Sequence, residues 1–152
     1  MRQQAHNTHS IPILFLCQDN TFRLTLAAWL TTAPDIQPAE AGKTDSYPGV
    51  IVLGINPQHS EDIQSVTRII AQYPLSRVLV LSQGDCPEAL VINAFREGVS
   101  GYLAVPSDEA ARAAFGEQVL QAIRVIQCGG AVISPRLTAH VLHEISSRSL
   151  SS

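Results

Sequence analysis

The fold of this chain is decided by one stretch of its sequence, Val50-Ile51-Val52-Leu53-Gly54-Ile55-Asn56-Pro57. Four consecutive apolar residues are followed by a glycine and then by Asn-Pro, which ends the run abruptly. A short apolar run between turn signals is typical of a strand buried on both faces of a parallel sheet. Because sites in open α/β sheets lie at the carboxyl ends of the strands, we expect a site around Gly54 and Asn56.

Two further runs have the same character, Ile13-Leu14-Phe15-Leu16-Cys17 and Val78-Leu79-Val80-Leu81-Ser82. Both end in small or polar residues, so three strand ends lying side by side would form a pocket. The segment 35–42 contains Pro38 and predicts an edge strand at best. Only five residues separate Gly42 from Pro48, so the helix expected between these strands is short or missing.

Amphipathic segments alternate with these runs and predict the helices. Phe22, Leu26, Trp29 and Leu30 mark one helical face after a cap at Asp19 or Asn20, and Ser60 is expected to cap the next helix. Asp85-Cys86-Pro87-Glu88 resembles a capping box with proline in the first turn. Residues 107–128 predict a long helix, although Gly116 suggests a later start. The remaining signals are a last strand over 101–106 and a final helix that begins after Ser134-Pro135.

The elements therefore predict an α/β protein, a doubly wound parallel sheet of five strands with an extra C-terminal helix. We expect a disordered arm over 1–10, one domain over 11–133, and a C-terminal helix followed by a linker over 134–152. The chain has 152 residues and a net charge of −3, which argues against direct binding of nucleic acid. It has no apolar run near the length of a membrane span, so a cytoplasmic protein is expected. Its three widely spaced cysteines fit neither a disulfide framework nor a zinc site.

Three segments of the second half carry a family resemblance: residues 77–82, residues 94–103 and residues 122–135, which end in Gly-Gly-x-x-x-Ser-Pro. They resemble the receiver domain of two-component response regulators, in the NarL/FixJ-type form that precedes a LuxR-type helix-turn-helix. The similarity extends from Pro12 to about Leu142, and the first half matches in pattern only. It implies a flavodoxin-like (CheY-like) fold and a role in phosphorelay signalling and transcription regulation.

The resemblance also places the family's phosphorylation chemistry on this sequence, where most of it is missing. The acidic pair that binds Mg²⁺ falls on Cys17 and Gln18, the phospho-acceptor aspartate falls on Gly54, and the lysine falls on Val105. A glycine cannot carry a phosphoryl group, and a thiol beside an amide is a poor site for Mg²⁺. Asp19 would replace one carboxylate only if the register shifted by one residue. The resemblance therefore implies a degenerate receiver, or pseudo-receiver, with no metal or other cofactor.

Other positions keep the residue type of the family. Asn56 keeps the position whose carbonyl faces the metal, Ser82 keeps the switch hydroxyl, and Tyr102 keeps the switch aromatic residue. The Val105–Pro106 bond keeps the position of a cis peptide. Tyr102, together with Phe115 and Val119, is also a candidate for an interface between two copies.

We therefore expect a regulatory domain that is independent of phosphorylation, forms a homodimer, and reaches DNA only through a C-terminal domain outside this chain. The alternative is an effector-sensing domain that binds a small molecule in the altered pocket around Cys17, Gln18, Gly54, Asn56 and Ser82. Enzymatic activity is not expected, because Cys17 has no assigned histidine partner. The pair His140 and His143 also lacks the spacing of a zinc protease.

Overall fold

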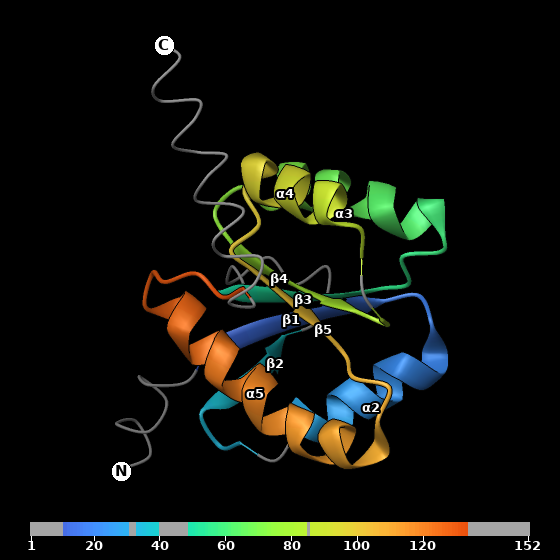
Figure 1. Cartoon of the computed structure of the whole chain (residues 1–152). Coiled ribbons are helices and arrows are strands. Elements are labelled where there is room, and N and C mark those ends of the chain that lie inside the picture. Colours follow the sequence, from blue (N-terminus) through green and yellow to red (C-terminus); the bar gives the residue numbers. More distant parts are fainter. Residues whose placement is uncertain (1–10, 31–32, 40–48, 85, 134–152) are drawn as a thin grey trace, which may run out of the picture.

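The computed structural model describes residues 11–30, 33–39, 49–84 and 86–133 (Figure 1). They form a five-stranded parallel sheet in the order β2-β1-β3-β4-β5. The strands are listed by their bounds: β1 Ile11–Cys17, β2 Ile36–Ala39, β3 Val50–Ile55, β4 Arg77–Ser82 and β5 Gly101–Ala104. Every residue of β3 is buried, as its unbroken apolar run predicts. The predicted α/β class, parallel sheet and weak edge strand are confirmed.

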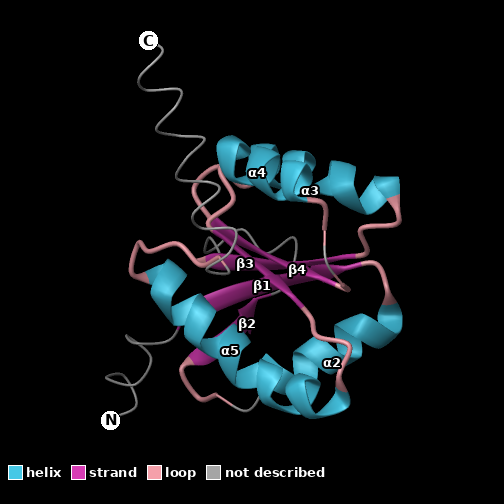
Figure 2. Ribbon diagram, viewed as in Figure 1, coloured by secondary structure: helices cyan, strands magenta, loops and turns pink. Residues whose placement is uncertain are grey.

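Four helices cover the two faces of this sheet (Figure 2). The helices α2 Asn20–Leu30 and α5 Glu109–Gln127 pack on one face, and α3 Ser60–Gln72 and α4 Glu88–Glu97 pack on the other. Alternate residues of each strand feed the two cores: Val50 and Val52 belong to the α2/α5 core, whereas Ile51 and Leu53 belong to the α3/α4 core. Within the described residues, no helix combines the length and apolar character that a membrane crossing requires.

The long helix α5 begins earlier than its glycine suggested. It starts at Glu109 and passes through Gly116 without interruption, and Asp108 caps it by accepting a hydrogen bond from the Ala111 N–H at 2.9 Å. A Cβ atom on Gly116 would lie only 2.7 Å from Cδ1 of Trp29. The glycine is therefore a contact point between α5 and α2, and the expected later start is wrong.

Three predicted helix caps or turns need correction. Ser60 is the first residue of α3, and the N-cap is His59, whose carbonyl accepts hydrogen bonds from the Asp62 and Ile63 N–H groups. Pro87 is the N-cap of α4, with no side-chain cap bond, so it does not lie in the first turn. The Val105–Pro106 bond is trans, since the described residues contain no cis peptide.

Other predictions fall outside the described residues. They concern the arm over 1–10, the short or missing helix within 40–48, the cap residue Asp85, and the C-terminal helix and linker over 134–152. The glycine predicted to end α4 is described and behaves as expected. Gly98 has a left-handed φ of 119°, and its N–H donates to the carbonyls of Ala94 and Phe95.

Candidate functional site

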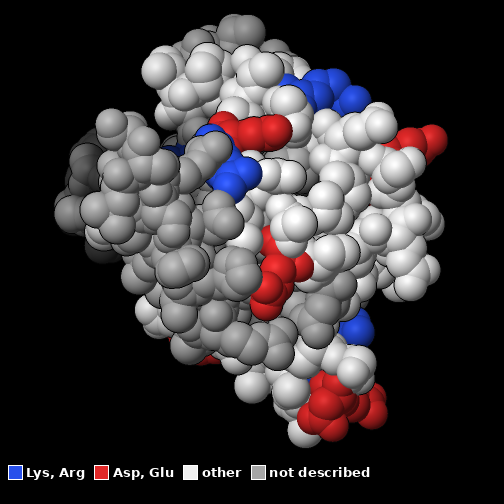
Figure 3. All heavy atoms as spheres, turned by 45° about the horizontal axis from the view of Figure 1, so that its top comes forward, with Lys and Arg blue, Asp and Glu red and all other residues white. Residues whose placement is uncertain are grey.

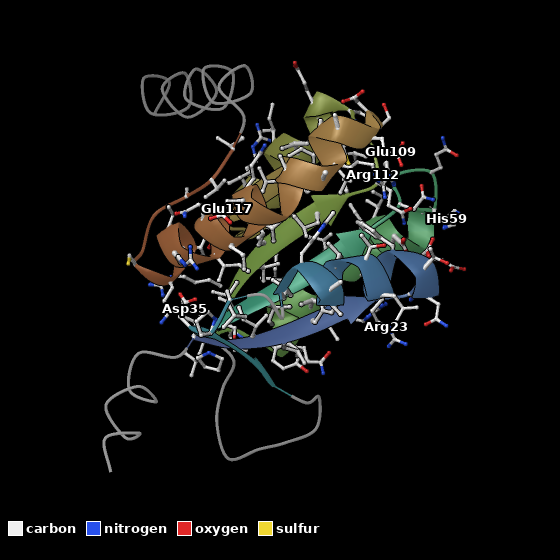
Figure 4. The ribbon with its side chains drawn as sticks, turned by 90° about the horizontal axis from the view of Figure 1, so that it is seen from below. Arg23, Asp35, His59, Glu109, Arg112 and Glu117 are labelled. Carbon is white, nitrogen blue, oxygen red and sulfur yellow. The ribbon has the colours of Figure 1, made fainter. Side chains whose placement is uncertain are left out.

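The carboxyl ends of β1, β3 and β4 meet at one edge of the sheet, as predicted. Cys17 at the end of β1 is paired with Gly54, and the next residue of β3, Ile55, is paired with Ser82 at the end of β4. Seen from below, Arg23, His59 and Arg112 surround this same end of the sheet (Figure 4). Within the described residues, no group of His, Cys, Asp and Glu side chains is arranged to hold a metal ion.

A side chain at Gly54 would crowd its neighbours. A Cβ atom built on it would lie 2.9 Å from the Sγ of Cys17, 3.1 Å from a ring carbon of Phe22 and 3.2 Å from the Cβ of Cys17. Phe22 is buried at the start of α2, and Cys17 packs against the same core. Burial raises the pKa of the Cys17 thiol, which keeps it protonated and uncharged. At the position that the resemblance assigned to the phospho-acceptor, a side chain would therefore require Cys17 and Phe22 to shift.

Asp19 caps α2 with its carboxylate. Its Oδ1 accepts a hydrogen bond from the Phe22 N–H at 3.0 Å, and its Oδ2 accepts one from the Gln83 side chain at 3.4 Å. The bond from the Phe22 N–H is the main cause that lowers the pKa of Asp19. The neighbouring Gln18 is exposed. Asp19 is thus an N-cap that also ties the loop after β1 to the loop after β4.

A buried carboxylate that the sequence analysis did not single out lies next to Asn56. Asp62 is only 7% exposed, and its Oδ2 accepts a hydrogen bond from the Asn56 N–H at 2.8 Å. The Asn56 side chain turns back and accepts a hydrogen bond from the Gln58 N–H at 3.0 Å. Both bonds fix the loop between β3 and α3. The only sequence signal for Asp62 was an acidic residue in the first turn of a helix.

Ser82 and Tyr102 are joined through Cys86. The Tyr102 hydroxyl oxygen accepts a hydrogen bond from the Cys86 N–H at 3.0 Å, and the Cys86 Sγ lies 3.4 Å from the Ser82 Oγ. Ser82 Oγ donates to the Gly84 carbonyl at 2.5 Å. Burial raises the pKa of Tyr102 to about 12, so its hydroxyl stays protonated at neutral pH. These three side chains form a polar network beneath the start of α4.

The sheet separates the predicted site residues into two groups. Cys17 and Val105 pack with the α2/α5 core, and Gly54 faces the same side through its contact with Phe22. Tyr102 and Cys86 pack with the α3/α4 core instead. The structure therefore brings Cys17 to Gly54 and joins Ser82 to Tyr102, but it does not gather all the predicted residues around one cavity.

The remaining interface candidates are core residues. Phe115 is 2% exposed and Val119 is fully buried, and the Phe115 ring makes an edge-on contact with Trp29 at a centroid distance of 5.5 Å. Tyr102 is 6% exposed. These side chains have no free surface to offer a second copy, so their expected place in an interface is corrected to a place in the core.

Two grooves lie near Gly54. One, of about 240 Å³, is lined by residues that include Cys17, Gln18 and Gly54 together with Asp62 and Arg68. The other, of about 210 Å³, is lined by residues that include Phe22, Gln83, Val105 and Arg112.

The fold is that of receiver domains. A crystal structure of a LuxR-family two-component response regulator from Aurantimonas sp. SI85-9A1 superposes with a TM-score of 0.64 at 20% identity, covering 90% of this chain and 99% of that one. No protein-family model matches the chain. It is 28% identical to the transcriptional regulatory protein DegU of Brevibacillus brevis, covering 95% of this chain and 61% of that protein. The relatives found by sequence are thus named as transcriptional regulatory proteins, and the solved structures with this fold include response regulators of the LuxR family.

A second relative supports the same relationship. The chain is 29% identical over 115 residues to the transcriptional regulatory protein LnrK of Bacillus subtilis (strain 168), covering 76% of this chain and 49% of LnrK. This receiver-fold chain thus spans about half to three fifths of the length of these two curated relatives.

Proposed function

We propose that this chain is a receiver-type regulatory domain that works without phosphorylation. One observation carries the proposal: Gly54 stands where the phospho-acceptor is expected, and Cys17 and Phe22 lie within 3.2 Å of the place that a Cβ atom would take there. A phosphoryl acceptor needs a nucleophilic oxygen with access to the donor. Gly54 has no side chain and therefore no such oxygen.

The nearby carboxylates support the proposal because each already has a structural partner. Asp19 accepts the Phe22 N–H at the start of α2, and Asp62 accepts the Asn56 N–H. A magnesium ion binds best to several oxygen ligands in near-octahedral geometry. Asp19 and Asp62 each use one carboxylate oxygen to fix a loop at the strand ends, and within the described residues no group of His, Cys, Asp and Glu side chains is arranged to hold a metal ion.

Phosphorylation is tested by incubating the protein with acetyl phosphate, or with beryllofluoride, in the presence of Mg²⁺. We expect no phosphoryl mass increment in intact-mass spectra and no change in Trp29 fluorescence, whereas a receiver with an intact acceptor aspartate, treated in parallel, responds. The variant Asp19→Asn tests whether Asp19 replaces one carboxylate of the missing acidic pair. It keeps a side chain that can cap α2 but removes the carboxylate. Labelling of the wild-type protein would overturn the proposal, and its loss in Asp19→Asn would show that the reaction needs the Asp19 carboxylate.

We further propose that the domain acts through assembly, as a homodimer, and that DNA is contacted by another domain. Support comes from the relatives, both named transcriptional regulatory proteins and both longer than this chain. The net charge of −3 makes this chain itself a poor partner for DNA phosphates. Sedimentation over a dilution series tests assembly: a concentration-dependent dimer is expected, and a monomer at all concentrations would contradict it.

A second candidate function is the binding of an effector in the groove beside Gly54. The favouring observation is that Cys17, Gln18 and Gly54 line this groove together with Asp62 and Arg68, which bring opposite charges to its walls. An effector held there would be polar. The test adds cytosolic metabolites to the wild-type protein and to an Arg68→Ala variant and follows their assembly. A change in the assembly of the wild-type protein that is absent in the variant would favour this function.

A further inference from the structure

A separate pocket of about 170 Å³ lies between α3 and α4, away from Gly54. Its floor is made of buried apolar side chains from both helices and from the ends of β3 and β4, namely Ile55, Val66, Val80 and Val91. Its rim carries the exposed residues Thr67, Asn93 and Glu97. The two helices lie side by side on this face of the sheet (Figure 1), and the surface of this face carries separate acidic and basic patches among uncharged residues (Figure 3).

The lining limits what the pocket can hold. Glu97 is the charged residue of the lining, and its carboxylate accepts a hydrogen bond from the Thr67 hydroxyl at 2.5 Å. No lysine or arginine is among the described residues of the lining, so an anion would find no counter-charge. Moving a cation from water into a pocket with mainly apolar walls is unfavourable unless an opposite charge lies close to it. A neutral molecule is therefore favoured.

The size of the pocket narrows the choice further. Engineered apolar cavities of about 150 Å³ bind benzene, so this pocket has room for one ring or a small fused ring system. A docked helix would need a groove for several apolar side chains over successive turns. The Thr67–Glu97 hydrogen bond joins α3 to α4 across the rim of the pocket. The dimensions fit a small molecule better than a protein segment.

We infer that the pocket between α3 and α4 is a binding site for a small, neutral, mainly aromatic molecule. Tyr102 and Cys86 belong to its lining, so the ligand would contact the same hydrogen-bonded network that includes Ser82. The inference rests on the proposed function in one respect: in a domain that is not phosphorylated, a non-covalent ligand at this network supplies the regulatory signal. Binding itself does not require that the domain lack phosphorylation.

Indole is the probe, and its binding is followed by amide chemical shifts in two-dimensional NMR of the whole chain. We expect saturable shifts in α3 and α4 with a dissociation constant of about 1 mM or tighter. The variant Ala94→Leu adds side-chain atoms inside the pocket and should weaken binding by about tenfold or more. Ala89→Leu is the matched control, since it makes the same change at an exposed position of α4 outside the pocket.

Leu90→Phe provides a second pocket-filling variant should Ala94→Leu fold poorly, because Leu90 is half-buried in the same lining. Loss of binding in the pocket variants with retention in Ala89→Leu supports the inference. Absence of saturable shifts, shifts centred on the groove beside Gly54, or equal binding by all variants would overturn it. The phosphorylation experiment fails or succeeds independently, since acetyl phosphate labelling and indole binding are read separately.

Discussion

Restoring a side chain at Gly54 should destabilise the protein instead of restoring a receiver's chemistry. The Cβ atom alone would lie 2.9 Å from the Cys17 Sγ and 3.1 Å from the Phe22 ring, so both neighbours must move. Adding atoms to a packed core costs about 1–3 kcal/mol, which is the expected loss for Gly54→Ala. Gly54→Asp also places a carboxyl group against the same two side chains, and leaving such a group without partners costs about 1–3 kcal/mol more.

A double-mutant cycle separates this contact from other effects. Cys17→Ala removes the Sγ atom, the nearest neighbour of the new Cβ, so Gly54→Ala should cost about 1 kcal/mol less in that background. The free energy of unfolding is measured by urea denaturation, with Trp29 fluorescence and circular dichroism as probes. Cys128→Ala, at an exposed cysteine, is the control and should show no coupling. A Gly54→Ala protein as stable as the wild type, or equal costs in both backgrounds, would refute the reasoning.

Three further predictions follow from named contacts. Gly116→Ala should lower the free energy of unfolding by about 1–2 kcal/mol despite its better helix propensity, because its Cβ would meet Trp29; a shift in Trp29 emission and the urea midpoint check this. The pKa of Asp19 is lowered in the folded state, so its cap stabilises the protein above the unfolded pKa and fades as pH falls through the folded pKa; Asp19→Ala should therefore reduce the thermal midpoint at pH 7 but not at pH 2. Tyr102→Phe leaves the Cys86 N–H without its acceptor and should cost about 1 kcal/mol, with faster amide exchange at Cys86 and unchanged exchange elsewhere in the core.

The sequence predicted the sheet well because parallel strands leave a strong signal. A strand covered on both faces has to be apolar at every position, and β3 and β4 carry such runs up to the residue where the sheet ends. The same logic placed the ends of β1, β3 and β4 together. Helix boundaries were predicted less accurately. The serine side chain favours a cap at Ser60, but the cap is His59, because its backbone is extended and Ser60 is already the first helical residue.

The contents of the site could be predicted only in part. The sequence showed that Gly54 lacks a nucleophile, but it could not show that Cys17 and Phe22 close the space, because that depends on packing between β1, β3 and α2. Gly116 was misread for the same reason: its propensity counts against a helix, whereas its contact with Trp29 requires a small residue there. Local propensity is a weak guide where two elements approach each other closely.

The contacts differ between the two faces of the sheet at its carboxyl edge. On the α2/α5 side of the sheet edge, the Cys17 and Phe22 side chains lie beside Gly54 and pack with the core. On the α3/α4 side, Ser82, Cys86 and Tyr102 remain hydrogen-bonded beside an open pocket. A packed core resists change, whereas an open pocket gains contacts when it is filled. If this domain still responds to a signal, the response should therefore arise beneath α4, and substitutions at Gly54 should alter stability without altering indole binding.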